Sequence, residues 1–425
     1  MQKYKRILID CSDTYSRDLN TGIQRVVRNI VERRNLMEDI LGIPVIPVVL
    51  TKSGYIGLDE FLRNNNDNGK SLKEKARKFL ASKVKNDVLN SIIKLLWYES
   101  SGIYYFLDFL LSRFRKKQTK IRHQNGDALL VIDASWMSVH TTRYLWAFIK
   151  QLHVENSFFI PLIYDIILIN NTGFFELATV KKFNKSFNNV VKYADHIITI
   201  SKSEKKIIEN HLKSLNTKKN IEYFYLGSNI NNSNDMPIRD SLKKFRDKKY
   251  FLTVGTIEPR KNLGFVLDVF EQYAWNNGLD KSVVICGKVG WKMRRLINRI
   301  ENSSYLNDKL FMFNDLNDSE LDFLYGHAHA LIFASEREGF GLPLVEAINK
   351  GLPVIASDID IFREVGGNYP VYFKLNDKNS LFNAIKTLDN GTDCKQKGLP
   401  NNKVLTWDES IEMLCDVLRG FNDIG

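Results

Sequence analysis

Residues 335–347 read SEREGFGLPLVEA, and this stretch decides the fold class more than any other part of the chain. It follows an apolar run at 330–334, which predicts a buried strand. Pro343 suits the first turn of a helix, and Gly351 suits the position just past the end of one. A strand, a glycine-containing loop and a helix in this order form the repeating unit of a parallel sheet covered by helices.

The same stretch carries two glutamates with the chemistry of a ligand site. Glu338 is predicted on the loop and Glu346 within the helix. Gly339 and Gly341 let the backbone approach a ligand closely, and the free N–H groups of the helix start suit a diphosphate. Glu338 can accept hydrogen bonds from hydroxyls there, and Glu346 from a second polyol such as a ribose. The alternative is an ordinary turn with two solvated glutamates.

Strands and helices alternate along the chain in two blocks. The first block has apolar runs, predicted as strands, at 5–10, 44–50, 128–132, 158–164 and 196–200. The second has them at 250–254, 282–286, 309–313, 330–334 and 353–356. Helices are predicted at 23–31, 141–151, 175–193, 263–276, 319–328 and 343–350, and a polar linker at 227–247. This pattern predicts an α/β protein with two Rossmann-like, doubly wound parallel-sheet domains that face a cleft, with ligands beyond the carboxyl ends of the strands.

The composition is that of a globular protein of two or three domains. The chain has 425 residues, a hydrophobic fraction of 44%, a charged fraction of 26% and a formal net charge of +12. These values exclude a disordered chain, a collagen-like fibre and a small disulfide scaffold. The four cysteines, at positions 11, 286, 394 and 415, lack Cys-x-x-Cys spacing, so we expect neither a metal site nor a disulfide framework.

The sequence predicts neither a signal peptide nor a membrane-spanning helix. The best candidate for a span, residues 88–111, is interrupted by Lys94, Glu99 and Asp108. We therefore expect a cytoplasmic protein, or one attached to the inner face of the cytoplasmic membrane without crossing it.

The positive charge is concentrated in residues 60–122. This stretch holds 15 Lys and Arg against six Asp and Glu, and it is rich in Tyr, Phe and Trp. Apolar spacing predicts helices at 72–79 and 84–97. Basic helices with aromatic residues suit an anionic membrane surface. The alternatives are a solvated insertion that packs on its own domain and, without any supporting signature, nucleic-acid binding.

A second segment with chemical character reads GTIEPRKNL at 255–263. It also lies where a predicted strand passes into a helix. Arg260 and Lys261 are adjacent cations that can neutralise the charge on a leaving diphosphate. The alternative is a surface basic pair.

Further candidates lie where other predicted strands end. Gly22, within the sequence TGIQR, can bring main-chain N–H groups onto a phosphate or form a structural turn; a full G-x-G-x-x-G motif is absent, which disfavours an NAD site. Asp165 follows an apolar strand and can contact a substrate hydroxyl or cap a helix. Asp10 and Asp133 are similar acids at strand ends, with less support for a functional role. His140 is more readily explained as a structural residue than as a catalytic base.

Together these segments resemble glycosyltransferase family 4, also called group 1, whose members have the GT-B fold. The resemblance is carried by residues 255–263 and 338–347, by GLPVIAS at 351–357 and by Glu364. The opening stretch at 10–29 looks like bacterial members that build surface polysaccharides such as O-antigen, including mannosyltransferases.

The resemblance implies roles for individual residues. The implied catalytic group is Glu338, Arg260, Lys261 and Asp165. The implied donor-binding residues are Gly22, Gly255, Asn314, Leu316, Gly339, Phe340, Gly341, Leu342 and Glu346. Arg260 and Lys261 would hold the donor diphosphate, and residues 314–316 would flank the nucleoside base. Glu338 would bind the donor sugar and Glu346 the ribose.

The implied reaction is retaining transfer of a hexose from a nucleotide-diphosphate sugar to a hydroxyl of a growing, lipid-linked bacterial surface polysaccharide, without a metal or other cofactor. GDP-mannose is the leading donor, and UDP-linked hexoses or N-acetylhexosamines and dTDP-rhamnose stay open. Many relatives have His-Asp where this chain has Tyr164-Asp165, which leaves one contact to the donor sugar undecided. A nucleotide-sugar epimerase or hydrolase of the same fold, and a non-catalytic nucleotide-sugar-binding assembly protein, remain alternatives to this role in O-antigen or lipopolysaccharide biosynthesis.

The expected domain layout follows from the linker and the resemblance. Residues 1–240 form the acceptor-side domain, with the basic insertion at 60–122, and residues 241–405 form the donor-binding domain. Residues 406–425 form a helix that crosses back to the first domain.

Overall fold

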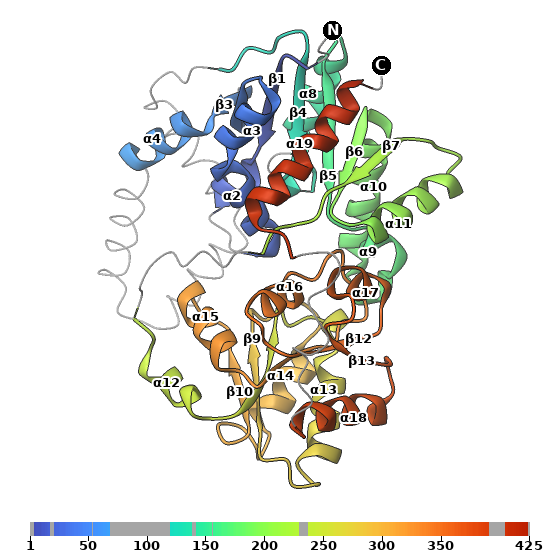
Figure 1. Ribbon diagram of the computed structural model, residues 1–425. Helices are drawn as coiled ribbons and strands as arrows, with labels where there is room; N and C mark the ends of the chain where they lie inside the picture. Colours follow the sequence, from blue (N-terminus) through green and yellow to red (C-terminus); the bar gives the residue numbers. More distant parts are fainter. Residues whose placement is uncertain are drawn as a thin grey trace, which may run out of the picture.

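The computed structural model describes residues 4–17, 21–52, 54–68, 120–137, 142–154, 156–228, 237–390 and 404–423. The basic helices expected at 72–79 and 84–97, and His140, lie outside these residues. Two α/β units follow one another along the chain and lie one above the other in Figure 1. We call them the N-terminal domain, built on the first sheet, and the C-terminal domain, built on the second.

The first sheet has seven strands in the order β3-β2-β1-β4-β5-β6-β7. The strands are β1 (Arg6–Asp10), β2 (Val45–Thr51), β3 (Gly54–Gly57), β4 (Asp127–Val131), β5 (Phe158–Ile163), β6 (His196–Thr199) and β7 (Asn220–Tyr223). All neighbours are parallel except β2 and β3, which form an antiparallel pair at one edge. The order reverses direction between β1 and β4, so this pair marks the switch point at which ligands of such sheets bind.

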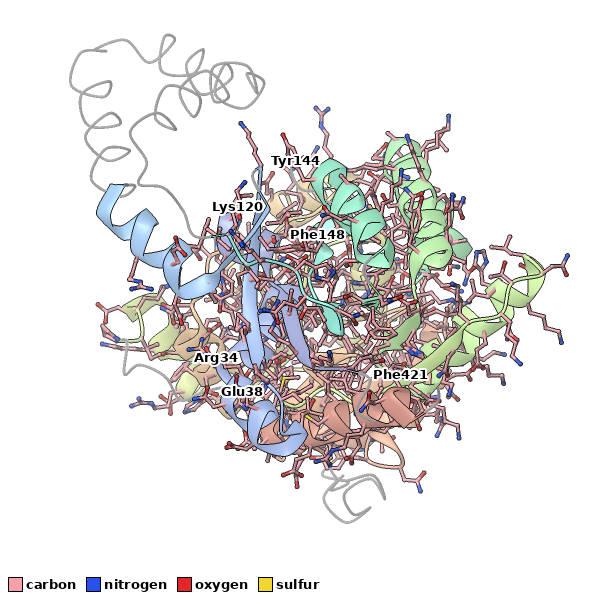
Figure 2. The ribbon with its side chains drawn as sticks, turned by 90° about the horizontal axis from the view of Figure 1, so that it is seen from above. Arg34, Glu38, Lys120, Tyr144, Phe148 and Phe421 are labelled. Atoms are coloured by element: carbon pink, nitrogen blue, oxygen red, sulfur yellow. The ribbon has the colours of Figure 1, made fainter. Side chains whose placement is uncertain are left out.

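Helices cover both faces of this sheet. Ile7 and Ile9 of β1 pack on one side and Leu8 on the other, because successive strand side chains alternate. The helices α2 (Gly22–Glu32), α3 (Arg34–Leu41) and α19 (Trp407–Asp423) cover the first side, and α8 (Thr142–Val154), α10 (Leu177–Tyr193) and α11 (Lys202–Ser214) the second. Figure 2 shows Tyr144 and Phe148 of α8 on one side of the sheet, and Glu38 of α3 and Phe421 of α19 on the other. The remaining helices of this domain in the described residues are α1 (Ser12–Arg17), α4 (Leu58–Asn68), η1 (Ala134–Trp136), α9 (Ile167–Asn170) and η2 (Thr172–Phe174).

The second sheet has six parallel strands in the order β10-β9-β8-β11-β12-β13. They are β8 (Tyr250–Val254), β9 (Ser282–Cys286), β10 (Leu310–Phe313), β11 (Ala330–Phe333), β12 (Val354–Ser357) and β13 (Val371–Phe373). One face carries α13 (Leu263–Val269), α14 (Arg294–Glu301) and α18 (Lys378–Asp389), and the other α15 (Asp318–His327), α16 (Leu342–Asn349) and α17 (Asp360–Gly366). Shorter elements are α12 (Asp240–Lys243), η3 (Lys244–Arg246), η4 (Pro259–Lys261) and η5 (Phe270–Ala274). The switch point of this sheet lies between β8 and β11.

The fold class predicted from the sequence is confirmed, since the chain forms two doubly wound sheets. Each expected strand is present, with its ends shifted by no more than one residue. The helix expected at 263–276 differs, because α13 ends at Val269 and the chain continues as a π-helical turn. Among the described residues, no helix is long and apolar enough to cross a bilayer.

The chain crosses between the domains twice, at neighbouring points. Ser228 donates its backbone N–H to Leu405 O at 3.1 Å. A Cβ on Gly227 would lie 2.5 Å from the Cα of Trp407, so the first crossing needs a glycine. After the second crossing, α19 lies across the N-terminal domain (Figure 1), where the ring of Phe421 stacks on His196 with 4.3 Å between the ring centroids.

Candidate functional site

The candidate site lies at the switch point of the second sheet. Glu338 follows β11, and Arg260 and Lys261 form the η4 turn that follows β8. Because β8 and β11 are neighbours, these three side chains meet. Nη1 of Arg260 lies 2.5 Å from Oε2 of Glu338, Nζ of Lys261 contacts Oε1, and Ser335 donates its hydroxyl to Oε1 at 2.7 Å.

The electrostatics keep Glu338 ionised. Burial alone would raise the pKa of this carboxyl group, but the charges of Arg260 and Lys261 and the hydrogen bonds from Lys261 and Ser335 lower it to about 2. Burial lowers the pKa of Lys261, and the charge of Glu338 opposes that effect. The Glu338 side chain is only 9% exposed, so the two cations and the carboxylate form a pre-organised, largely dry cluster.

Glycines shape the backbone around this cluster. Gly255 has a φ of +137°, and a Cβ there would lie 3.2 Å from Nζ of Lys261. A Cβ on Gly287, which follows β9, would lie 1.9 Å from the carbonyl oxygen of Gly255. The two loops therefore pack directly against each other, which fixes the segment that carries Lys261.

The loop after Glu338 touches the N-terminal domain. A Cβ on Gly339 would lie 2.6 Å from the carbonyl oxygen of Tyr164 and 3.2 Å from Cβ of Asp165. Ser201, at the end of β6, donates its hydroxyl to Gly339 O at 3.0 Å. The structure thus brings Asp165 to the Glu338 loop from the opposite domain.

Tyr164 and Asp165 present different groups at this contact. The hydroxyl of Tyr164 donates to Ile132 O at 2.7 Å, which directs the side chain into the N-terminal domain. Burial raises the pKa of Asp165, while Arg260 and Lys261 lower it. Asp165 Oδ1 also accepts the backbone N–H of Ile167 at 3.1 Å, as expected for a turn-capping acid.

The two residues after Gly339 complete the turn into α16. Phe340 is buried, and Gly341 has a φ of +101° at the N-cap of the helix. A Cβ on Gly341 would lie 3.0 Å from the ring of Phe362. Leu342, the first residue of α16, faces Gly22, whose Cβ position lies 4.0 Å from Leu342 Cδ1. The N-termini of α2 and α16 therefore approach each other from the two domains.

Glu346 lies one turn further along α16 and is already engaged. Its Oε1 lies 2.8 Å from Nη2 of Arg25 on α2, and its Oε2 accepts the hydroxyl of Tyr325 at 2.9 Å. The sequence did not assign Arg25, although it lies three residues after Gly22 and thus on the same helix face.

Asn314 and Leu316 lie at the carboxyl end of the edge strand β10, two strands from β8. Arg239 holds the loop between them: its Nη1 lies 3.0 Å from both carboxylate oxygens of Asp315, and its Nε lies 2.6 Å from Glu320. This loop leads into α15, whose Tyr325 reaches Glu346.

Two acids at the switch point of the first sheet accept hydrogen bonds from backbone N–H groups. Asp133 accepts the backbone N–H groups of Thr14 at 2.6 Å and Ala134 at 2.8 Å. Asp10 accepts the N–H of Ser12 at 3.1 Å. Burial is the main cause that raises the pKa of Asp10 to about 7.

Glu364, which the sequence noted without a role, caps a helix of the other domain. Its two carboxylate oxygens accept the backbone N–H groups of Lys202 and Ser203, both at 2.7 Å, at the start of α11. The sequence singled out Glu364 only because it matched a family motif, and that match does not identify its partner, the start of α11.

No group of three or more His, Cys, Asp or Glu residues in the described part of the chain is placed to hold a metal ion. Cys11, Cys286 and Cys415 are buried free thiols.

Comparisons of sequence identify relatives. Residues 235–396 match the family model described as glycosyl transferases group 1. The chain is 28% identical over 426 residues to a serotype-specific mannosyltransferase WbdA of Escherichia coli, covering 96% of this chain and 44% of that protein. It is 30% identical over 220 residues to the O-antigen chain mannosyltransferase RfbU of Salmonella typhimurium, covering 51% of this chain and 57% of the relative. The chain thus spans about half the length of the curated relatives it matches.

Comparisons of structure agree on the fold. The sucrose-phosphate synthase of Thermosynechococcus elongatus is similar over 98% of both chains, with a TM-score of 0.60 and 14% identity. A glycosyltransferase of Rickettsia africae is similar over 99% of this chain and 100% of its own, with a TM-score of 0.58 and 16% identity. The two sheets and the structural neighbours show the GT-B fold, and within it residues 235–396, which carry the Arg260 and Glu338 loops, match the glycosyl transferases group 1 family.

Proposed function

We propose that this chain is a retaining glycosyltransferase that moves a hexose from a nucleotide-diphosphate sugar to a hydroxyl of a bacterial surface polysaccharide. The observation that carries the proposal is the buried cluster of Glu338, Arg260 and Lys261 at the switch point of the second sheet. A fixed pair of cations beside a carboxylate suits a donor that presents both a diphosphate and sugar hydroxyls.

The reaction is electrostatic in character. The bond from the anomeric carbon to the diphosphate breaks as the acceptor oxygen bonds to that carbon on the same face, and the acceptor's proton passes to the departing phosphate oxygen. Arg260, Lys261 and the N-terminus of α16 stabilise the negative charge that builds on the diphosphate. Loss of one such pre-organised contact costs about 3 kcal/mol, or a factor of 10²–10³ in rate.

We propose GDP-mannose as the first donor to test, because the relatives WbdA and RfbU are named as mannosyltransferases. By the same reasoning, the acceptor is a lipid-linked O-antigen-type glycan. Residues 1–240 would supply the acceptor side and residues 241–405 the donor side, with 406–425 returning to the first domain. The basic, aromatic stretch at 60–122 would bring a cytoplasmic protein to the anionic inner membrane surface.

A thermal-shift panel with GDP, UDP, dTDP and their sugar conjugates identifies the donor class. A specific ligand stabilises the folded state by RT ln(1 + [L]/Kd), so one nucleotide family should raise the unfolding midpoint selectively. Product analysis with and without an acceptor glycan then separates transfer from epimerisation or hydrolysis. Rapid donor epimerisation without an acceptor would replace our proposal by the epimerase alternative.

Two variants test the site itself. We expect Glu338→Gln and Arg260→Ala each to lose transfer activity by about 10²–10³ while circular dichroism shows a folded protein. The control is Arg299→Ala, which removes an arginine paired with Asp268 and Glu271 on the far face of the second sheet. Wild-type turnover in either site variant would contradict the assignment of that residue to the catalytic site.

A further inference from the structure

Arg25 is a charged side chain of the N-terminal domain that reaches into the C-terminal domain. It lies one turn into α2, and its Nη2 is 2.8 Å from Oε1 of Glu346 on α16. The hydroxyl of Tyr325, on α15, donates to the other oxygen of the same carboxylate at 2.9 Å. Three helices therefore meet at one carboxylate, and α2 comes from the opposite domain.

The carboxylate of this pair is withdrawn from water. The Glu346 side chain is 2% exposed and the Arg25 side chain 29% exposed. The charge of Glu346 is the largest cause that raises the pKa of Arg25, so the guanidinium stays charged. A buried carboxylate that loses its cation is strongly destabilised. The orientation of Glu346 thus depends on Arg25.

The carboxylate keeps hydrogen-bonding capacity beyond these two contacts. An ionised carboxylate offers about four acceptor positions, and Arg25 and Tyr325 occupy two of them. The remaining positions suit a vicinal diol. The facing starts of α2 and α16, marked by Gly22 and Leu342, lie at the same boundary and suit the attached phosphates.

We propose that Arg25 is a positioning residue of the donor site. It holds the Glu346 carboxylate in the orientation that receives the ribose hydroxyls of the donor, and it makes nucleotide binding depend on contact between the two domains. This inference rests on the proposed function, in which Glu346 binds the ribose.

The test is a double-mutant cycle read by nucleotide binding. The probe is whichever of GDP, UDP and dTDP stabilises the wild type most, measured by isothermal titration calorimetry on Arg25→Ala, Glu346→Ala and the double variant. We expect each single variant to weaken binding about tenfold or more, as when a charge-assisted hydrogen bond is lost. The double variant should bind within about twofold of Glu346→Ala, because Arg25 acts through Glu346.

Kinetics separate positioning from a general structural role. Arg25→Ala should raise the donor KM and leave kcat at saturating donor within about threefold, since ribose contacts are made equally in the ground and transition states. Arg25→Lys should recover part of the affinity. Tyr325→Phe should also raise the donor KM without changing kcat, by a smaller factor than Arg25→Ala. If Arg25→Ala fails to fold, Tyr325→Phe still tests whether holding the Glu346 carboxylate in place supports nucleotide binding.

Arg33→Ala is the matched control. This arginine follows the same helix and pairs with Asp408 on α19 at 2.5 Å, away from α16. Its removal should leave nucleotide binding unchanged. Additive losses in the double variant, or a fall in kcat with an unchanged donor KM, would overturn the role of Arg25 while leaving the proposed transfer reaction intact. Undiminished binding in Glu346→Ala would remove the ribose role and this inference with it, whereas Glu338→Gln still tests the reaction.

Discussion

At the scale of single residues, Asp10 shows how the fold changes the chemistry of a side chain. Burial at the end of β1 raises its pKa to about 7, from an ordinary value of 3.8. Between those values the folded protein holds a proton that the unfolded chain has released. The free energy of unfolding therefore falls as the pH rises through this window, by about 1.4 kcal/mol for each pH unit.

We predict that Asp10→Asn removes this pH dependence. Asparagine is neutral at every pH and its Oδ1 can still accept the N–H of Ser12. In urea unfolding from pH 4 to pH 8, the free energy of unfolding of the variant should increase relative to that of the wild type as the pH rises. This difference should level off above about pH 7. Asp280→Asn, at an exposed position, is the control. Parallel pH profiles for Asp10→Asn and the wild type would contradict the prediction.

Residue identity was predictable from the sequence where a local motif carried it. Glu338, Arg260 and Lys261 stand in short segments beside glycines, and the adjacency of β8 and β11 brings them together. Arg25 and Glu364 were not assigned, because their partners, Glu346 and the start of α11, lie more than 150 residues away in the chain. A pattern of nearby residues contains no information about such a contact.

At the scale of elements, the strands with long apolar runs were predictable, whereas three of the four edge strands of the two described sheets were not. The unpredicted β3, β7 and β13 read GYIG, NIEY and VYF. Each is only three or four residues long and lies at or beside the edge of its sheet, where fewer positions must be apolar. The π-helical turn after α13 was also missed, since its apolar spacing continues that of the helix.

The loop between β11 and α16 yields a prediction at this scale. A Cβ on Gly339 would lie 2.6 Å from Tyr164 O, closer than real Cβ atoms come, so Gly339→Ala must push the loop away from the N-terminal domain. We expect transfer activity to fall at least about tenfold, because the loop also carries Glu338 and misplacement of such groups is costly. Steady-state kinetics on the folded variant measures the effect.

Gly420→Ala provides the matched control. Gly420 lies in α19, and nothing lies within 4 Å of the Cβ that alanine would add. Alanine is the better helix former, so this variant should be at least as stable as the wild type and fully active. Equal activity in Gly339→Ala and Gly420→Ala would show that the loop tolerates displacement from Tyr164.

At the scale of the whole molecule, the two domains are joined by more than the two crossings. One hydrophobic cluster runs from Ile7 of the first sheet through Phe340 and Trp407 to Leu252 of the second. Arg25 and Glu364 add charged contacts across the same boundary. The sequence predicted two domains that face a cleft but none of these contacts between them, because the contacts join segments that no local pattern relates.

A tryptophan of the C-terminal domain makes a further contact across the boundary. Trp291 follows Gly290, whose backbone N–H donates to Ile257 O at 2.8 Å beside the segment that carries Arg260. The indole N–H of Trp291 donates to Phe174 O at 2.7 Å, and its ring stacks on Phe175 with 5.4 Å between centroids. The loop thus ties the segment that carries Arg260 to the N-terminal domain.

We predict that Trp291→Ala loosens the approach of the two domains. The variant loses one hydrogen bond and one aromatic pair, together about 2 kcal/mol. Small-angle X-ray scattering should show a larger radius of gyration than for the wild type, and nucleotide should reduce the difference, because the donor site that we propose takes groups from both domains. Trp291→Phe keeps a ring for stacking, so its radius of gyration should lie between those of the wild type and Trp291→Ala. Val289→Ala, on the same loop and 45% exposed, should scatter like the wild type. Identical scattering from the alanine variants of Trp291 and Val289 would mean that the crossings and the shared cluster alone hold the domains together.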